Sequence, residues 1–125
     1  MTTRKHLTMA TLRRDGSPRI SGTEVQFKDG ELTIGSMTGA VKAMDLARDG
    51  RVALHGPTHD PAKSGSWRGE AKVAGRAIAI AGEGDAHFFR IDVTEAVITQ
   101  LNTSKDQLVV ESWTPQRGHR TLARR

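Results

Sequence analysis

Two Asp-Gly pairs, Asp15-Gly16 and Asp29-Gly30, constrain the fold of this chain more than any other feature. Each pair separates two strand-like runs, and an Asp-Gly step between such runs is a strong signal for a tight β-hairpin turn. Pro18 is consistent with a strand that begins there. Proline lacks a backbone N–H, and the first residue of a strand can do without that hydrogen-bond donor. We therefore predict a meander of three consecutive strands, over residues 7–13, 18–27 and 31–36.

One short helix is predicted after the meander. It begins at Gly39 or Ala40, is capped by Thr38, and ends at about Arg48 because Asp49-Gly50 follows. Helical spacing places the following residues on one apolar face: Ala40, Val41, Ala43, Met44 and Ala47. The opposite, polar face is then expected to hold Lys42, Asp45 and Arg48.

The second half of the chain predicts mostly strands. Four runs have strand character: 51–55, 70–80, 87–101 (one long bent strand or two) and 108–113. Gly75 inside its run indicates a bulge or a close backbone approach. The basic segment from Thr114 onward is most simply a solvated end. Six or seven short strands with one helix favour a small barrel or sandwich, in a single domain over residues 1–125.

The turn before the helix carries the strongest functional signal. Residues 35–42 combine small residues, the hydroxyls of Ser36 and Thr38, and Lys42 at one helix N-terminus. Free backbone N–H groups at such a terminus bind phosphate. On a small β body, a phosphate held in this way points toward a nucleotide-like redox cofactor.

Composition narrows the possible partners. Nineteen Lys and Arg against 14 Asp and Glu give a net charge of +5, which favours an anionic partner such as nucleic acid, a membrane surface or a phosphorylated small molecule. Five scattered aromatic rings (three Phe and two Trp) are few for stacking on single-stranded nucleic acid. The absence of cysteine excludes disulfides and thiolate catalysis. No metal site, signal segment or membrane span is expected, and the cytoplasm is the expected compartment.

Four segments, in this order and spacing, are similar to a known family: Ala10–Arg19, Lys42–Leu54, Ala71–Ala77 and Phe89–Glu95. The chain resembles the pyridoxamine 5′-phosphate oxidase-like split β-barrels, which bind FMN or the related deazaflavin coenzyme F-420. The resemblance implies a mainly β split barrel of six to seven antiparallel strands, Greek-key-like, with one short helix. It also implies a homodimer with the cofactor at the subunit interface.

The resemblance further implies which residues hold the cofactor. The ring system would contact Arg19, Ile20, Ser21, Gly22, Gly35, Ser36 and Met37. The phosphate would be held by Ser36, Thr38 and Lys42, and Trp113 with Arg120 would complete the neighbouring subunit's pocket. Simpler interpretations stay open, namely a solvated Lys42, an exposed Arg19, a plain helix cap at Thr38 and a core position for Trp113. No side chain is assigned as catalytic, because the cofactor supplies the chemistry.

Two departures from the family pattern refine the prediction. Val41 stands where relatives often have an Arg, and the closing Arg-x-His-Asp-Arg of the oxidases is absent from residues 119–125. Together with the basic composition, these departures slightly favour the deazaflavin coenzyme over FMN and argue against pyridoxal phosphate chemistry. We expect an oxidoreductase that transfers two electrons (hydride) to or from a small organic substrate. The alternatives are a non-catalytic binder of flavin or another anionic ligand and, less favoured, a basic nucleic-acid-binding β-barrel.

Overall fold

The computed structural model describes residues 3–36, 40–65, 67–80, 87–102 and 104–124. These residues form one helix and eight strands. The helix is α1 (Val41–Arg48). The strands are β1 (Thr3–Leu12), β2 (Pro18–Lys28), β3 (Glu31–Ser36), β4 (Arg51–His55), β5 (Glu70–Ile80), β6 (His87–Leu101), β7 (Leu108–Thr114) and β8 (Gly118–Arg124).

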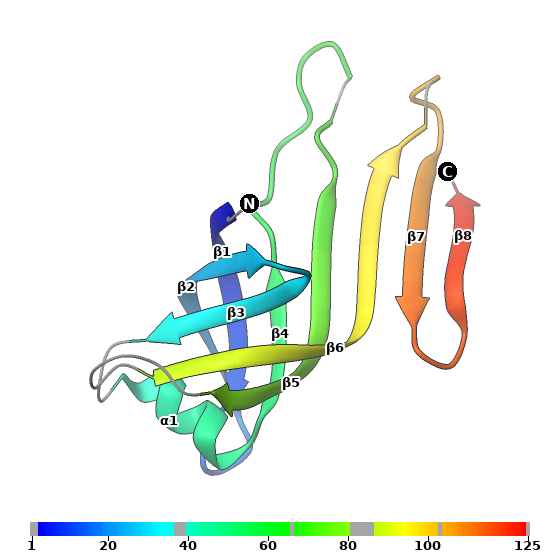
Figure 1. Cartoon of the computed structure of the whole chain (residues 1–125). Coiled ribbons are helices and arrows are strands. Elements are labelled where there is room, and N and C mark those ends of the chain that lie inside the picture. The colour runs from blue at the N-terminus through cyan, green and yellow to red at the C-terminus, as the bar shows by residue number, and fades with distance from the viewer. Residues whose placement is uncertain (1–2, 37–39, 66, 81–86, 103, 125) are drawn as a thin grey trace.

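Six of these strands close into an antiparallel barrel. Their order is β3-β2-β1-β4-β5-β6, and β3 pairs back onto the first residues of β6 to complete the ring. The later residues of β6 instead pair with β7, and β7 pairs with β8, so these two strands extend the sheet beyond the barrel. Figure 1 shows the β7–β8 hairpin standing apart from the barrel and from α1. The predicted split β-barrel with one short helix is confirmed.

Short-range hydrogen bonds and left-handed backbone conformations form the two predicted hairpin turns. In the first, Asp15 accepts hydrogen bonds from the backbone N–H of Ser17 at 2.9 Å and from its hydroxyl at 2.6 Å. In the second, Asp29 and Gly30 have φ values of 52° and 79°, the left-handed pair that a two-residue hairpin turn requires. Both turn predictions are confirmed.

The predicted irregularity at Gly75 is also confirmed. The register between β5 and β6 shifts between Ala74 and Gly75. A Cβ at position 75 would clash with the backbone carbonyl oxygen of Asp92 on β6. The bulge therefore requires glycine, because the two backbones approach too closely for a side chain.

The hydrophobic core lies inside the barrel and beneath α1. Every barrel strand contributes to it, and α1 adds Ala43 and Leu46. The buried apolar residues are Met9, Val25, Ile34, Ala43, Leu46, Val52, Leu54, Ala77, Phe89 and Ile91. Among the described residues, no helix has the length and apolar character that crossing a membrane would need.

Two expectations from the sequence are wrong. The predicted apolar helix face fails, because Val41 and Met44 are each 55% exposed whereas Asp45 is buried. The basic end is not simply solvated chain, because Gly118–Arg124 forms β8 against β7. In the first case a set of ion pairs outweighs helical periodicity, and in the second the strand gains its partner only from the tertiary fold.

Candidate functional site

A hollow of about 450 Å³ lies where α1 begins. Strands β1, β2 and β3 and the first residues of the helix form its walls. The lining residues are His6, Leu7, Gly22, Thr23, Glu24, Gly35, Ala40 and Lys42. The fold thus brings together Gly22, Gly35 and Lys42, three residues that the sequence predicted for one site.

Lys42 is anchored rather than freely solvated. Its ammonium Nζ donates a hydrogen bond of 2.7 Å to the backbone carbonyl oxygen of Gly22 on β2. An ammonium group has three N–H donors, so two remain beyond this bond. Because Lys42 also lines the hollow, a fixed positive charge faces this space, with N–H donors that bond to no other described residue.

The start of α1 adds further donors. Ala40 is the N-cap residue, and no side chain of the described residues caps the helix there. The first N–H groups of a helix have no partner within the helix and carry partial positive charge. Met37 and Thr38, the latter predicted as the cap, lie outside the described residues. Glu24 also lines this hollow and adds a negative charge, so the hollow does not carry positive charge alone.

Strand β2 divides the predicted Arg19–Gly22 group between its two sides. Side chains alternate along a strand, so Arg19 and Ser21 share the barrel-facing side with the buried Thr23. Ile20 lies on the outer side and is 73% exposed. The Ser21 hydroxyl oxygen is buried and has no hydrogen-bond partner among the described residues. Buried hydroxyls normally have a partner, so this atom marks a place for a water or ligand.

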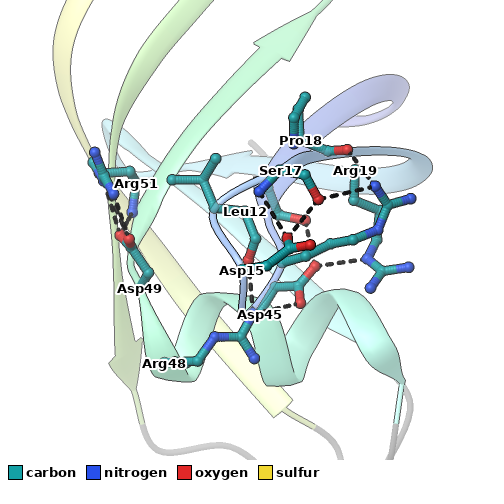
Figure 2. Close-up of polar contacts among 11 residues, drawn as sticks. Leu12, Asp15, Ser17, Pro18, Arg19, Asp45, Arg48, Asp49 and Arg51 are labelled. Atoms are coloured by element: carbon teal, nitrogen blue, oxygen red, sulfur yellow. Dashed lines mark hydrogen bonds and ion pairs between the residues drawn. The ribbon is translucent and has the colours of Figure 1, made fainter.

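Asp45 is the centre of a buried polar network that the sequence did not reveal. Its carboxylate accepts hydrogen bonds from Thr11 Oγ1 at 2.8 Å, Arg19 Nε at 2.7 Å and Arg48 Nη2 at 2.9 Å. Arg48 Nη2 also donates to the carbonyl oxygen of Leu12 at 2.7 Å. Figure 2 shows Asp45 on the helix between Arg19 and Arg48. The network fastens α1 to the β1–β2 hairpin.

The network keeps Asp45 ionised. Burial alone raises the pKa of Asp45, but the hydrogen bonds from Arg19, Thr11 and Arg48 together outweigh it and hold the pKa below its ordinary value. Arg19, which was predicted to contact the cofactor, therefore donates its Nε–H to Asp45 instead. The only sequence signal for the network was the i,i+3 spacing of Asp45 and Arg48, which is equally typical of a solvated helix face.

The remaining predicted residues that the structure describes lie on β3, β7 and β8. Trp113 on β7 is 39% exposed, and Arg120 on β8 is exposed. Trp113 pairs with His119, and Arg120 pairs with Ser112, so Trp113 and Arg120 project to opposite faces of the sheet. Figure 1 shows both strands well separated from α1. Ser36 is the last residue of β3, paired with His87.

Comparisons with known proteins identify the fold. No family model matches the chain, and no curated protein matches it. A pyridoxamine 5′-phosphate oxidase-related, FMN binding protein from Nostoc punctiforme matches with a TM-score of 0.72 at 10% identity, over 97% of this chain and 87% of that one. A heme binding protein from Mycobacterium smegmatis matches with a TM-score of 0.62 at 12% identity, over 96% and 82%. An F420 reductase matches with a TM-score of 0.55 at 15% identity, over 72% and 86%.

The chain is therefore a split β-barrel with the fold of the pyridoxamine 5′-phosphate oxidase-related proteins. Identities of 10% to 15% establish this shared architecture. The proteins that share it include an FMN binding protein and an F420 reductase, and also a heme binding protein. The choice of ligand therefore depends on the residues of this chain.

Proposed function

We propose that this protein is an oxidoreductase that binds FMN or the deazaflavin coenzyme F-420 and exchanges two electrons with a small organic substrate. The observation that carries the proposal is the Lys42 ammonium, fixed on the carbonyl oxygen of Gly22 beside the start of α1, at the edge of a hollow. A lysine and helix N-terminal N–H groups are a common donor set for phosphate.

The donor set fits one phosphate group. Lys42 supplies the cation, and the first turn of α1 supplies backbone donors. Val41, at the position where an Arg is often found, adds no charge, and Glu24 reduces the attraction. We therefore expect cofactor binding that is weakened by salt. When bound, the cofactor supplies the hydride chemistry. The described residues position it and shield it from water.

We further propose that the site is completed by a second copy of the chain. Trp113 and Arg120 stand on the β7–β8 hairpin, away from their own α1, and project to opposite faces of the sheet, so a second copy's hollow would take one of them. Ile20 on the outer face of the barrel is 73% exposed, and Leu122 on β8 is 61% exposed. Apolar surface of this kind favours burial against another subunit.

Two substitutions test the cofactor site. Lys42→Ala should weaken binding of FMN or F-420 by about 1.5–3 kcal/mol, because one charge-assisted hydrogen bond is lost. Gly22→Val should block the hollow without disturbing the barrel, because a Cβ at Gly22 meets no atom within 4 Å. Binding is measured by fluorescence titration with each cofactor. Thermal unfolding of the apo protein should stay nearly unchanged for both variants.

Lys63→Ala is the matched control, since Lys63 is exposed and lies outside the hollow. If it weakens binding as much as Lys42→Ala does, Lys42 has no specific role. If neither cofactor binds the parent protein more tightly than about 100 µM, which corresponds to roughly 5.5 kcal/mol, the proposal fails.

A second candidate is a non-catalytic binder of a flavin or another anionic ligand. It is favoured by the similar heme binding protein. The two functions differ in how the bound cofactor behaves. An oxidoreductase should reoxidise its photoreduced cofactor with a small quinone faster than the free cofactor reacts. A binder should protect the cofactor and slow the same reaction.

A further inference from the structure

A second hollow, of about 410 Å³, lies between the β1–β2 hairpin and the exposed side of α1. We call it the arginine cleft. It differs from the hollow beside Lys42, with which it shares no lining residue. Its lining comprises Arg13, Arg14, Arg19, Arg48, Val41 and Met44, together with Asp15 and Asp45.

The cleft has an excess of positive charge. Four guanidinium groups face two carboxylates. Both carboxylates are already engaged, Asp45 by Arg19 and Arg48, and Asp15 by the N–H and hydroxyl of Ser17. Hydrogen bonds from Ser17 also lower the pKa of Asp15, so it stays ionised. Four positive charges against two negative ones leave the cleft with a net charge of +2.

Three of the four arginines are held in place by hydrogen bonds. Asp45 fixes Arg19 through Nε and Arg48 through Nη2, which leaves the other guanidinium nitrogens of both residues. Arg13 Nη1 donates to the carbonyl oxygen of Pro18 at 2.8 Å. Arg14 forms no hydrogen bond or ion pair with the described residues and is exposed. A preorganised guanidinium cluster of this kind suits carboxylate or phosphate oxygens.

The other wall of the cleft is apolar. Val41 and Met44, three residues apart on α1, are each 55% exposed. An apolar pair on a helix that packs against a barrel would ordinarily face the core. Here Asp45 occupies the inward position, and the two apolar side chains line the cleft instead.

From this combination we propose that the arginine cleft binds an organic anion. Its phosphate or carboxylate group would lie among the guanidinium groups, and its apolar body would lie against Val41 and Met44. The site shares no lining residue with the proposed cofactor hollow and does not rest on the proposed function; Arg19, which the resemblance assigned to the cofactor, lies in this cleft instead. Charge and apolar contact act together, so neither inorganic phosphate nor a neutral aromatic compound should bind as well.

The test uses phenyl phosphate as probe, titrated by isothermal calorimetry into the purified protein, with inorganic phosphate and phenol in parallel. We expect phenyl phosphate to bind more tightly than either. Arg14→Gln should weaken it roughly five- to tenfold, because a charged hydrogen bond is lost at a partly solvated site. Met44→Gln, which keeps the side-chain length, should weaken it about threefold. Arg14 is exposed and Met44 half-exposed, so both variants should fold.

Controls separate this site from the cofactor hollow. Arg117→Gln removes the same charge from an exposed position outside the cleft, and it should leave phenyl phosphate affinity unchanged. Lys42→Ala should also leave it unchanged. The proposal is overturned if Arg117→Gln weakens binding as much as Arg14→Gln, if Lys42→Ala or saturating FMN abolishes it, or if no saturable binding appears below about 10 mM. Failure of FMN binding alone would overturn only the proposed function.

Discussion

The closed barrel and the β7–β8 extension are built from similar strands but reach opposite degrees of burial. In the barrel, apolar side chains from all six strands and α1 meet in one core, and Met9 and Leu54 are 1% and 2% exposed. In the extension and the part of β6 that pairs with it, no described side chain from residue 96 to residue 124 is buried. A closed barrel encloses an interior in which side chains are buried, whereas a single sheet layer has no such interior.

The extension nevertheless carries apolar side chains on both faces. Ile98 and Trp113, 47% and 39% exposed, share one face, while Val110 and Leu122 are paired on the other. A two-sided apolar sheet without a covering layer gains little from its own packing. The comparison teaches that the barrel stabilises itself, and that the extension is suited to contact with another surface, in line with the proposed second copy.

The largest expected effect tests the barrel side of this comparison. Leu54→Ala should lower the free energy of unfolding by about 2–5 kcal/mol, because it leaves a cavity in a closed core. Leu122→Asp should leave barrel unfolding nearly unchanged but weaken self-association. Urea denaturation and sedimentation at several protein concentrations measure the two quantities. A monomeric parent protein would contradict the proposed role of the extension, and equal destabilisation by both variants would contradict the comparison itself.

A smaller effect is expected at the attachment of α1 to the barrel. Asp45→Asn keeps the shape of the side chain but removes the charge that Arg19 and Arg48 share. We expect a loss of about 2–4 kcal/mol in unfolding free energy, because breaking a buried ion pair leaves half-buried cations without a counter-charge. Asp49→Asn, at an exposed pair with Arg51, is the control and should cost far less. Equal costs would show that burial of Asp45 is unimportant.

The smallest expected effect is a pH dependence of the stability that the Asp45 carboxylate contributes. The pKa of Asp45 is lower in the folded protein than in the unfolded chain, so its contribution is complete above the unfolded value of about 3.9. This contribution is lost as the pH falls through the lower folded value. The stability difference between the parent protein and Asp45→Asn should therefore narrow in urea titrations from pH 5 to about pH 3. A constant difference would indicate that the Asp45 charge does not stabilise the fold.

Local sequence chemistry predicted most strands and turns of this protein. The bounds of β3, β4, β5 and β6 match the expectation, and Asp29-Gly30 forms the expected turn because two left-handed residues in succession suit few other pairs. The strand at Gly118–Arg124 was missed because its polar, basic sequence has no alternation, and it becomes a strand only by pairing with β7.

The candidate site was predicted less completely than the fold. The sequence indicated Lys42 and the preceding turn, but it gave no reason to expect the Lys42 ammonium on the carbonyl of Gly22, 20 residues earlier. It also assigned Val41 and Met44 to the buried face, because helical periodicity reports which residues share a face and not which face is covered. In the structure Val41 and Met44 face outward instead, and they form the apolar wall of the arginine cleft.

By itself the sequence determined the β-rich class, the hairpin turns, the absence of cysteine chemistry and the place of the one short helix. Tertiary structure alone decided that β3 closes onto β6, that Asp45 is buried, and that the two hollows lie apart. The physical reason is the separation along the sequence of the residues that interact. Turn and strand preferences arise between neighbouring residues, whereas a carboxylate can be buried only when Thr11, Arg19 and Arg48 arrive together from three different elements.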